Sequence, residues 1–129
     1  MSGAEIRRHR HPAAARAARV RFAHPSERLF AALLDVHEVE WEYEPVEFAL
    51  AWSEDGYPSA GFRPDFWLPA QACFVELTTA DQRLVTRKNA KIRRLRQLYP
   101  DVALVVVYQR DFFDLLARNG LDPFLLRAA

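Results

Sequence analysis

Two acidic residues lie within apolar segments that are expected to form strands, and they are the residues best suited to chemistry. Asp65 lies in an aromatic run at residues 61–68, and Glu76 lies in a second apolar run at residues 72–78. A carboxylate buried in a strand is unfavourable unless a cation compensates its charge. Two such carboxylates on neighbouring strands also repel each other, and a divalent cation between them removes that repulsion. The pattern therefore predicts a metal site.

The helix expected after these strands has lysines where apolar residues would normally face the core. Residues 83–96 contain seven basic residues and no acidic one, which suggests that the third component of the site is a phosphodiester. A lysine on a buried stripe either extends to solvent or pairs with an anion. With a helical rise of about 1.5 Å per residue, Lys88 should lie nearer the depth of Glu76 than Lys91 does, so Lys88 is favoured. The core-facing stripe reads Leu84, Lys88, Lys91, Leu95 and Leu98.

Hydrolysis of a phosphodiester requires a cation that activates water and neutralises charge in the transition state. Mg²⁺, or Mn²⁺ in its place, prefers oxygen ligands, typically one or two carboxylates together with waters and a substrate phosphate. Glu27 or a backbone carbonyl could complete the shell around Asp65 and Glu76. Glu27 fits equally well as a first-turn glutamate that the helix dipole favours. Zinc is not expected, because the histidines lack the spacing of metal ligands and the chain has one cysteine, Cys73.

Arginines of the same helix are candidates for contacts to the phosphate groups of a nucleic acid. They spread around the helix, so a solvated face is the alternative reading of their role. The three candidates are Arg83, Arg87 and Arg94.

Length and composition predict one globular domain. The chain has 129 residues, of which 50% are hydrophobic and 27% are charged, and this is enough to bury a core. No apolar run reaches the length of a membrane span, and the start of the chain lacks a secretory signal. The single cysteine fits a reducing compartment, so we expect a cytoplasmic protein with no membrane partner. Residues 1–21 hold six arginines against one acid, which predicts a basic, mobile arm at 1–22 and a single domain at 23–129.

Hydrophobic periodicity and turn residues predict the elements that hold these side chains. A helix is expected from Ser26, as N-cap, to about Val36. The alternating segment 38–48 predicts a half-buried strand whose four glutamates are exposed and therefore weak metal candidates. The remaining elements are a continuation of that strand at 48–52, a turn at 53–56, strands at 57–68 and 72–78, a helix at 79–99, a strand covered on both faces at 102–108, a helix at 111–119 and a short tail at 121–127. This order predicts an α/β fold, a three-layer α-β-α sandwich around a mixed central sheet.

The dipeptide Pro64-Asp65, followed by Glu76-Leu77-Thr78 on strands after a helix that carries Glu27, resembles the PD-(D/E)XK nuclease superfamily. The resemblance covers roughly residues 26–110. It implies a restriction-endonuclease-like core, a divalent metal at the aspartate and the glutamate, and cleavage of DNA. A homodimer would be the simplest way for such an enzyme to cut both strands of a duplex.

One residue departs from the pattern of that superfamily. Its lysine, two residues after the glutamate, is Thr78 in this chain. Some members of the superfamily recruit a lysine from the following helix, and Lys88 or Lys91 suits that substitution. The competing hypothesis is a catalytically inactive nuclease-like domain that binds nucleic acid or a protein partner.

Overall fold

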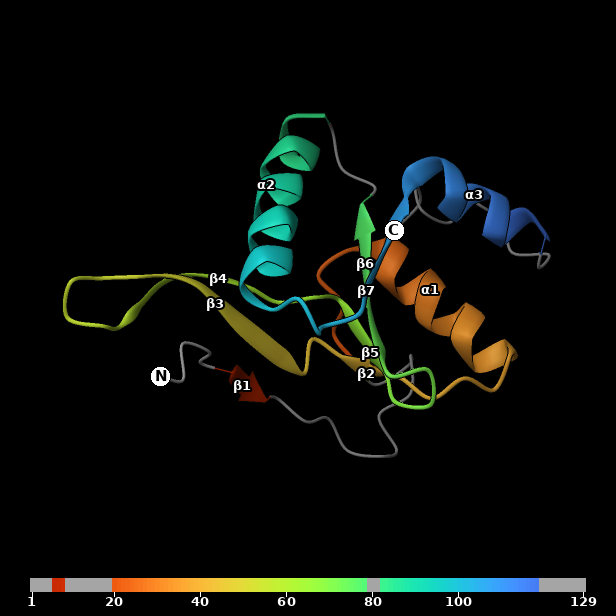
Figure 1. The fold of residues 1–129 in the computed structure, drawn as a ribbon. Coiled ribbons are helices and arrows are strands. Elements are labelled where there is room, and N and C mark those ends of the chain that lie inside the picture. The colour runs from red at the N-terminus through yellow and green to blue at the C-terminus, as the bar shows by residue number, and fades with distance from the viewer. Residues whose placement is uncertain (1–5, 9–19, 79–81, 119–129) are drawn as a thin grey trace.

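The computed structural model describes residues 6–8, 20–78 and 82–118 and has a mixed α/β fold (Figure 1). The first residues of the helix predicted at 79–99, residues 79–81, and the tail at 121–127 lie outside these ranges. The helices in this part of the chain are α1 (Pro25–Val36), α2 (Gln82–Leu98) and α3 (Gln109–Arg118). The strands are β1 (Ile6–Arg8), β2 (Glu42–Tyr43), β3 (Val46–Trp52), β4 (Pro58–Phe62), β5 (Phe66–Leu68), β6 (Cys73–Thr78) and β7 (Leu104–Tyr108).

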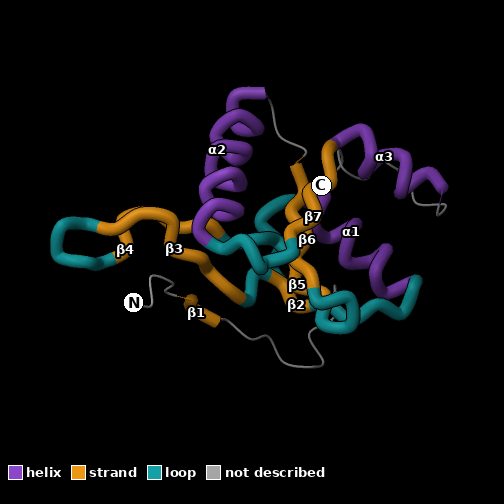
Figure 2. The backbone as a smooth tube through the Cα atoms, in the orientation of Figure 1, coloured by secondary structure: helices purple, strands orange, loops and turns teal. Residues whose placement is uncertain are grey.

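The strands form two sheets. One has three strands in the order β1-β3-β4, and the other has four strands in the order β2-β5-β6-β7. The four-stranded sheet is mixed, because β6 and β7 run parallel while the other neighbours run antiparallel. A mixed sheet was predicted, but the two-sheet arrangement was not. The β3–β4 hairpin extends away from the helices, and its turn is the teal loop farthest from α3 (Figure 2).

Two segments that were predicted as single strands are each divided between the two sheets. The segment 38–48 bends at Glu44, whose φ of 45° is in the left-handed region, and Pro45 follows it without an N–H group to donate. The segment 57–68 breaks at 63–65, where Pro64 again interrupts the ladder. The predicted exposed row of glutamates on one strand is therefore wrong, since only Glu42 lies in β2.

Helices cover both faces of the four-stranded sheet (Figure 1). The side chains of β6 alternate between two apolar clusters, because successive residues of a strand point to opposite faces. Val75 and Leu77 pack with α1 and with Phe112 of α3. Phe74 packs with Leu95 of α2. Glu76, which lies between Val75 and Leu77, therefore points to the α2 face.

The described residues of the predicted arm, 6–8 and 20–22, contact the domain. β1 pairs antiparallel with β3, although residues 1–22 were expected to form a mobile arm. Val20 is buried and Phe22 packs against the core, so the domain begins before residue 23. The N-cap of α1 is His24 instead of Ser26: its ring accepts from the backbone N–H of Ser26, and Pro25 is the first helical residue.

Strand β7 was predicted to be covered on both faces and is only partly so. Leu104 is buried, whereas Val105 and Tyr108 are 50% and 44% exposed. The reason is topological, because β7 is the last strand of its sheet. Among the helices that the structure describes, none is long and apolar enough to cross a membrane.

Candidate active site

Asp65 and Glu76 face each other across two antiparallel strands. The register of β5 and β6 pairs Phe66 with Val75, and one further step sets Asp65 opposite Glu76. Each carboxylate bonds to the backbone of the other strand. The N–H of Asp65 donates to Oε1 of Glu76 at 3.0 Å, and the N–H of Leu77 donates to Oδ2 of Asp65 at 2.9 Å. Both side chains are buried, at 8% and 3% relative exposure, so the two acids form one desolvated pair.

Lys88 supplies the positive charge closest to this pair. Its Nζ lies 2.7 Å from Oε2 of Glu76 and donates to the carbonyl of Leu77 at 2.7 Å. Lys91, the second lysine of the predicted core stripe, is exposed, and its Nζ donates to the carbonyl of Gly61 at 3.3 Å. Ile92 occupies the buried position instead. The placement of Lys91 on the buried stripe is therefore wrong. Lys88 is half-buried and lies nearer Glu76 than Lys91 does, as predicted.

The pair is electrostatically strained. Burial raises the pKa of Asp65 to about 9, and the charges of Glu76 and Glu27 add to this effect. Burial also raises the pKa of Glu76, while the Lys88 ammonium acts against the shift. Because the Lys88 ammonium contacts Glu76 and not Asp65, it acts against the rise in pKa mainly at Glu76.

Glu27 is held by a hydrogen-bond network of its own. Its Oε1 accepts from the hydroxyl of Tyr43 at 2.5 Å, from the N–H of Ala23 at 3.1 Å and from the N–H of His24 at 3.3 Å. Burial and the hydrogen bond to Glu27 raise the pKa of Tyr43 far above its ordinary value. Glu27 lies in the first turn of α1 and takes part in its capping box, which agrees with its interpretation as a first-turn glutamate. Its charge also contributes to raising the pKa of Asp65 and of Glu76.

Thr78 replaces the lysine of the family pattern and lies two residues after Glu76, on the same face of β6. It is 2% exposed. Among the described side chains, its hydroxyl is the buried polar group that has no hydrogen-bond partner. Such a group is unfavourable unless it meets a ligand or a water molecule, so the site contains an unsatisfied donor beside the acids.

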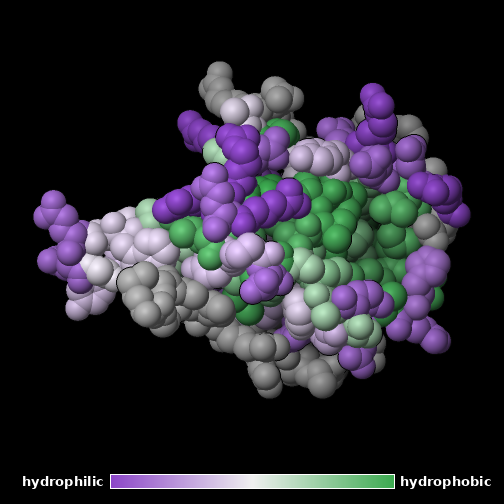
Figure 3. Space-filling model, viewed as in Figure 1, coloured by the Kyte–Doolittle hydropathy of each residue, from purple (hydrophilic) through white to green (hydrophobic). Residues whose placement is uncertain are grey.

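Three basic residues of α2 lie on one side of the helix. Arg87, Lys91 and Arg94 are exposed and are spaced four and three residues apart, so they share one side of the helix and form what we call the α2 basic stripe. Arg94 also donates to the carbonyl of Leu50 at 3.2 Å. The side chain of Arg83 lies outside the described part of the chain. The hydrophilic surface over α2 is visible in Figure 3.

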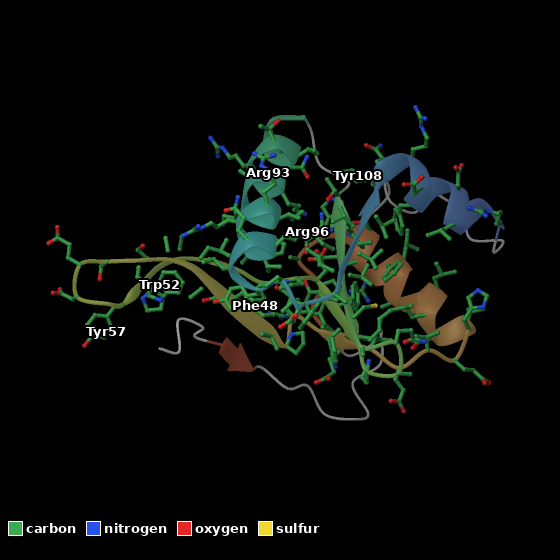
Figure 4. All side chains as sticks on the ribbon, viewed as in Figure 1. Phe48, Trp52, Tyr57, Arg93, Arg96 and Tyr108 are labelled. Carbon is green, nitrogen blue, oxygen red and sulfur yellow. The ribbon has the colours of Figure 1, made fainter. Side chains whose placement is uncertain are left out.

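Sequence reasoning did not identify Arg93, Arg96 or Tyr43 as part of this region. Arg93 and Arg96 are exposed on α2 (Figure 4), and Arg96 donates to the carbonyl of Leu104 at 3.0 Å. The seven-residue basic run contained the signal for both arginines. Tyr43 gave no such signal, because its contact with Glu27 joins residues sixteen positions apart in the sequence.

The donor groups fit a hard divalent cation in chemistry and in charge. Asp65 and Glu76 provide the one or two carboxylates by which Mg²⁺ is usually bound. Together with Glu27 they carry up to three negative charges, against one ammonium from Lys88, and the hydroxyl of Thr78 is unsatisfied. Within the described residues, however, no three His, Cys, Asp or Glu side chains gather closely enough to hold a metal ion. The cation would thus be held by the pair, and Glu27 would act on it through its charge.

No protein-family model, curated protein or solved structure matches this chain.

Proposed function

We propose that this protein is a metal-dependent DNA nuclease of the PD-(D/E)XK type, with the lysine of the active site supplied by α2. The observation that carries the proposal is the buried pair Asp65–Glu76 with the Lys88 ammonium 2.7 Å from Glu76. Burying two like charges is costly, so a pair of this kind lowers the stability of a domain. Such a pair is therefore expected where a function requires it. Perturbed carboxylates beside a lysine are typical of functional sites.

The order of the elements supports a restriction-endonuclease-like core. A helix (α1) precedes the antiparallel strands, α2 follows the strand that carries Glu76, and β7 returns parallel to that strand. Helices on both faces of the mixed sheet agree with the α-β-α arrangement that the family resemblance implies.

Each residue has a distinct role in the proposed reaction. Asp65 and Glu76 would hold Mg²⁺ or Mn²⁺, and that cation would supply charge neutralisation and activation of water. Lys88 stabilises negative charge on the phosphate, the role of the family lysine that Thr78 cannot perform. In hydrolysis the water oxygen forms a bond to phosphorus, the bond to the leaving sugar oxygen breaks, and that oxygen takes up a proton. The α2 basic stripe, and Arg83 beside it in the sequence, would contact the DNA backbone.

A plasmid-cleavage assay with Mg²⁺ or Mn²⁺ tests the proposal. We expect the wild-type protein to cut and Asp65→Asn to lose at least about 100-fold in rate, since a site without its metal loses the activated water. Asp35→Asn is the matched control, because Asp35 is a half-buried acid that accepts a hydrogen bond from Trp41 elsewhere in the fold. Lys88→Met should abolish cleavage even at saturating DNA, whereas Lys91→Met, which alters the α2 basic stripe, should weaken DNA binding but retain cleavage at saturating DNA. Cleavage that persists in Asp65→Asn, or that is absent with both metals, would contradict the proposal.

A binding domain without catalysis is the second candidate. It is favoured by the same hydrogen bonds, because Leu77, Lys88 and the backbone of Asp65 partly satisfy the acids without a metal. Such a domain would bind DNA in a salt-dependent manner with equal affinity in wild type and Asp65→Asn. Binding of that kind without cleavage would support it, and a homodimer that cuts both strands would exclude it.

A further inference from the structure

The hydroxyl of Tyr43 lies at the centre of a hydrogen-bond network around Glu27, and the proposed reaction gives this hydroxyl no role. Tyr43 is in β2, at 4% exposure, and its hydroxyl donates to Oε1 of Glu27 at 2.5 Å. The same hydroxyl accepts from the N–H of Ala23 at 3.0 Å. Ala23 N–H, the Tyr43 hydroxyl and Glu27 Oε1 therefore contact one another in a closed triangle.

All the hydrogen bonds that described donors make to Glu27 fall on one of its two oxygens. Ala23, His24 and Tyr43 donate to Oε1, and none of the donors in the described residues reaches Oε2. A carboxylate that accepts several hydrogen bonds on one oxygen is fixed in orientation. The three donors therefore fix the orientation of the Glu27 carboxylate.

The backbone connects this network to the carboxylate pair. Tyr43 pairs with Phe66 in the ladder between β2 and β5, and the N–H of Glu44 donates to the carbonyl of Asp65 at 2.8 Å. The backbone of Tyr43 thus lies within one ladder step of the backbone of Asp65. The charge of Glu27 raises the pKa of both Asp65 and Glu76, which agrees with this proximity.

We propose that Tyr43 is a positioning residue for divalent-cation binding: its hydroxyl fixes Glu27 so that the Glu27 charge increases the affinity of the Asp65–Glu76 pair for the cation. This inference rests on the proposed function, because it assumes that the pair binds a metal. It goes further in assigning to Tyr43 a role that the sequence pattern does not contain. Groups that orient the residues of a metal site typically change metal affinity by about 10–100-fold when they are removed.

Calorimetric titration with Mn²⁺ at pH 7, without DNA, tests the proposal on the full chain. Tyr43→Phe deletes the hydroxyl alone and should weaken Mn²⁺ binding by about tenfold or more. Tyr99→Phe is the matched control, since the hydroxyl of Tyr99 also donates within the fold, to the carbonyl of Ala49 at 2.8 Å, but packs with β3 and α2. Its Mn²⁺ affinity should equal that of the wild type, although both variants lose some stability.

A double-mutant cycle separates positioning from general destabilisation. Glu27→Gln keeps the capping box, because glutamine serves at this position as glutamate does, and it removes the charge. In the Glu27→Gln background, Tyr43→Phe should have no further effect on Mn²⁺ affinity. Equal Mn²⁺ affinities of Tyr43→Phe and wild type would overturn the inference while the proposed metal site stands. Equal additional losses in both backgrounds would also overturn it, and a wild-type protein that binds no Mn²⁺ would overturn both proposals.

Discussion

Lys88 is the residue on which the charge balance of the site depends. It comes from α2, while the acid that it neutralises comes from β6, so its contact with Glu76 joins two layers of the fold. Glu76 is 3% exposed and cannot exchange this partner for water. A charge left without its partner in such an environment is more costly than the pair is favourable.

We predict that Lys88→Met destabilises the protein by about 2–4 kcal/mol, close to the loss expected when one partner of a buried ion pair is removed. The methionine retains the apolar length of the side chain, so the loss reports the uncompensated Glu76. Urea unfolding at pH 7 measures it. Lys91→Met is the control and should change stability by less than about 0.5 kcal/mol, because Lys91 is exposed. Equal effects of the two substitutions would show that the ion pair with Glu76 has no special importance.

Asp65 should make the stability of the metal-free protein depend on pH. Its pKa is about 9 in the fold and about 4 in an unfolded chain. The folded state therefore binds the extra proton between these values, so stability is full below about pH 4 and is lost as the pH rises towards about 9. Asp65→Asn lacks this titration. At pH 8 without metal it should melt at a higher temperature than the wild type, and the difference should vanish near pH 4.

Added Mg²⁺ or Mn²⁺ supplies the second half of that measurement. The wild type should gain stability at pH 8 as the cation binds, and Asp65→Asn should gain none. Differential scanning calorimetry with and without the cation checks both statements. A wild type that is already more stable than Asp65→Asn in metal-free buffer at pH 8 would contradict the raised pKa.

At the scale of single residues, the sequence allowed the proximity of two acids and one lysine to be predicted. Asp65 and Glu76 could be identified because an acid within an apolar strand is anomalous, and Lys88 because a lysine on a core stripe is anomalous. Lys91 was placed wrongly, since a stripe of period 3.6 passes as easily through Ile92. The contact of Tyr43 with Glu27 could not be predicted, because β2 consists of two residues whose place beside β5 depends on tertiary packing.

At the scale of elements, the β5–β6 hairpin is the unit that holds the two acids opposite each other. Its turn contains Ala72, whose φ of 52° lies in the left-handed region. Residues other than glycine, asparagine and aspartate are unfavourable in this conformation. The register that pairs Asp65 with Glu76 is therefore maintained against a small local strain.

We predict that Ala72→Gly stabilises the protein by up to about 1 kcal/mol, because glycine adopts this φ without strain and its greater freedom in the unfolded chain offsets only part of the gain. Ala70→Gly in the same exposed turn is the matched control, since Ala70 has no positive φ, and it should be destabilising by about 0.5–1 kcal/mol. Thermal unfolding of both variants measures the difference. A lower melting temperature for Ala72→Gly than for Ala70→Gly would contradict this description of the turn.

Some of the elements could be predicted from the sequence and others could not. The types and approximate bounds of α1, α2, β6 and α3 were predicted, because each has a clear period and clear ends. The division of segments 38–48 and 57–68 between two sheets was not. A proline in a strand pattern is compatible with an edge, a bulge or a change of sheet, and local sequence does not distinguish these outcomes.

At the scale of the whole molecule, charge is distributed unevenly although its sum is only +1. The helix α2 contains no acid, and its basic stripe runs along the side of the helix that meets the β3–β4 hairpin, as the contacts of Lys91 with Gly61 and of Arg94 with Leu50 indicate. The carboxylate pair lies beneath the same helix, with Lys88 between them. A polyanion bound along the stripe would therefore pass close to the acids.

This arrangement predicts how DNA affinity depends on salt. Each phosphate contact contributes about 0.9 to the slope of log affinity against log salt for duplex DNA. Arg87 is exposed and makes no hydrogen bond or ion pair within the described residues, so Arg87→Ala should lower the slope by about 0.9 and weaken binding equally for all DNA sequences. Fluorescence anisotropy with a labelled duplex at several salt concentrations measures this slope.

Arg118→Ala on α3 is the control and should leave the slope unchanged, because α3 lies with α1 on the other face of the sheet. A slope that falls equally for both variants would mean that DNA is held by net charge alone, and an unchanged slope for Arg87→Ala would remove the stripe from the interface.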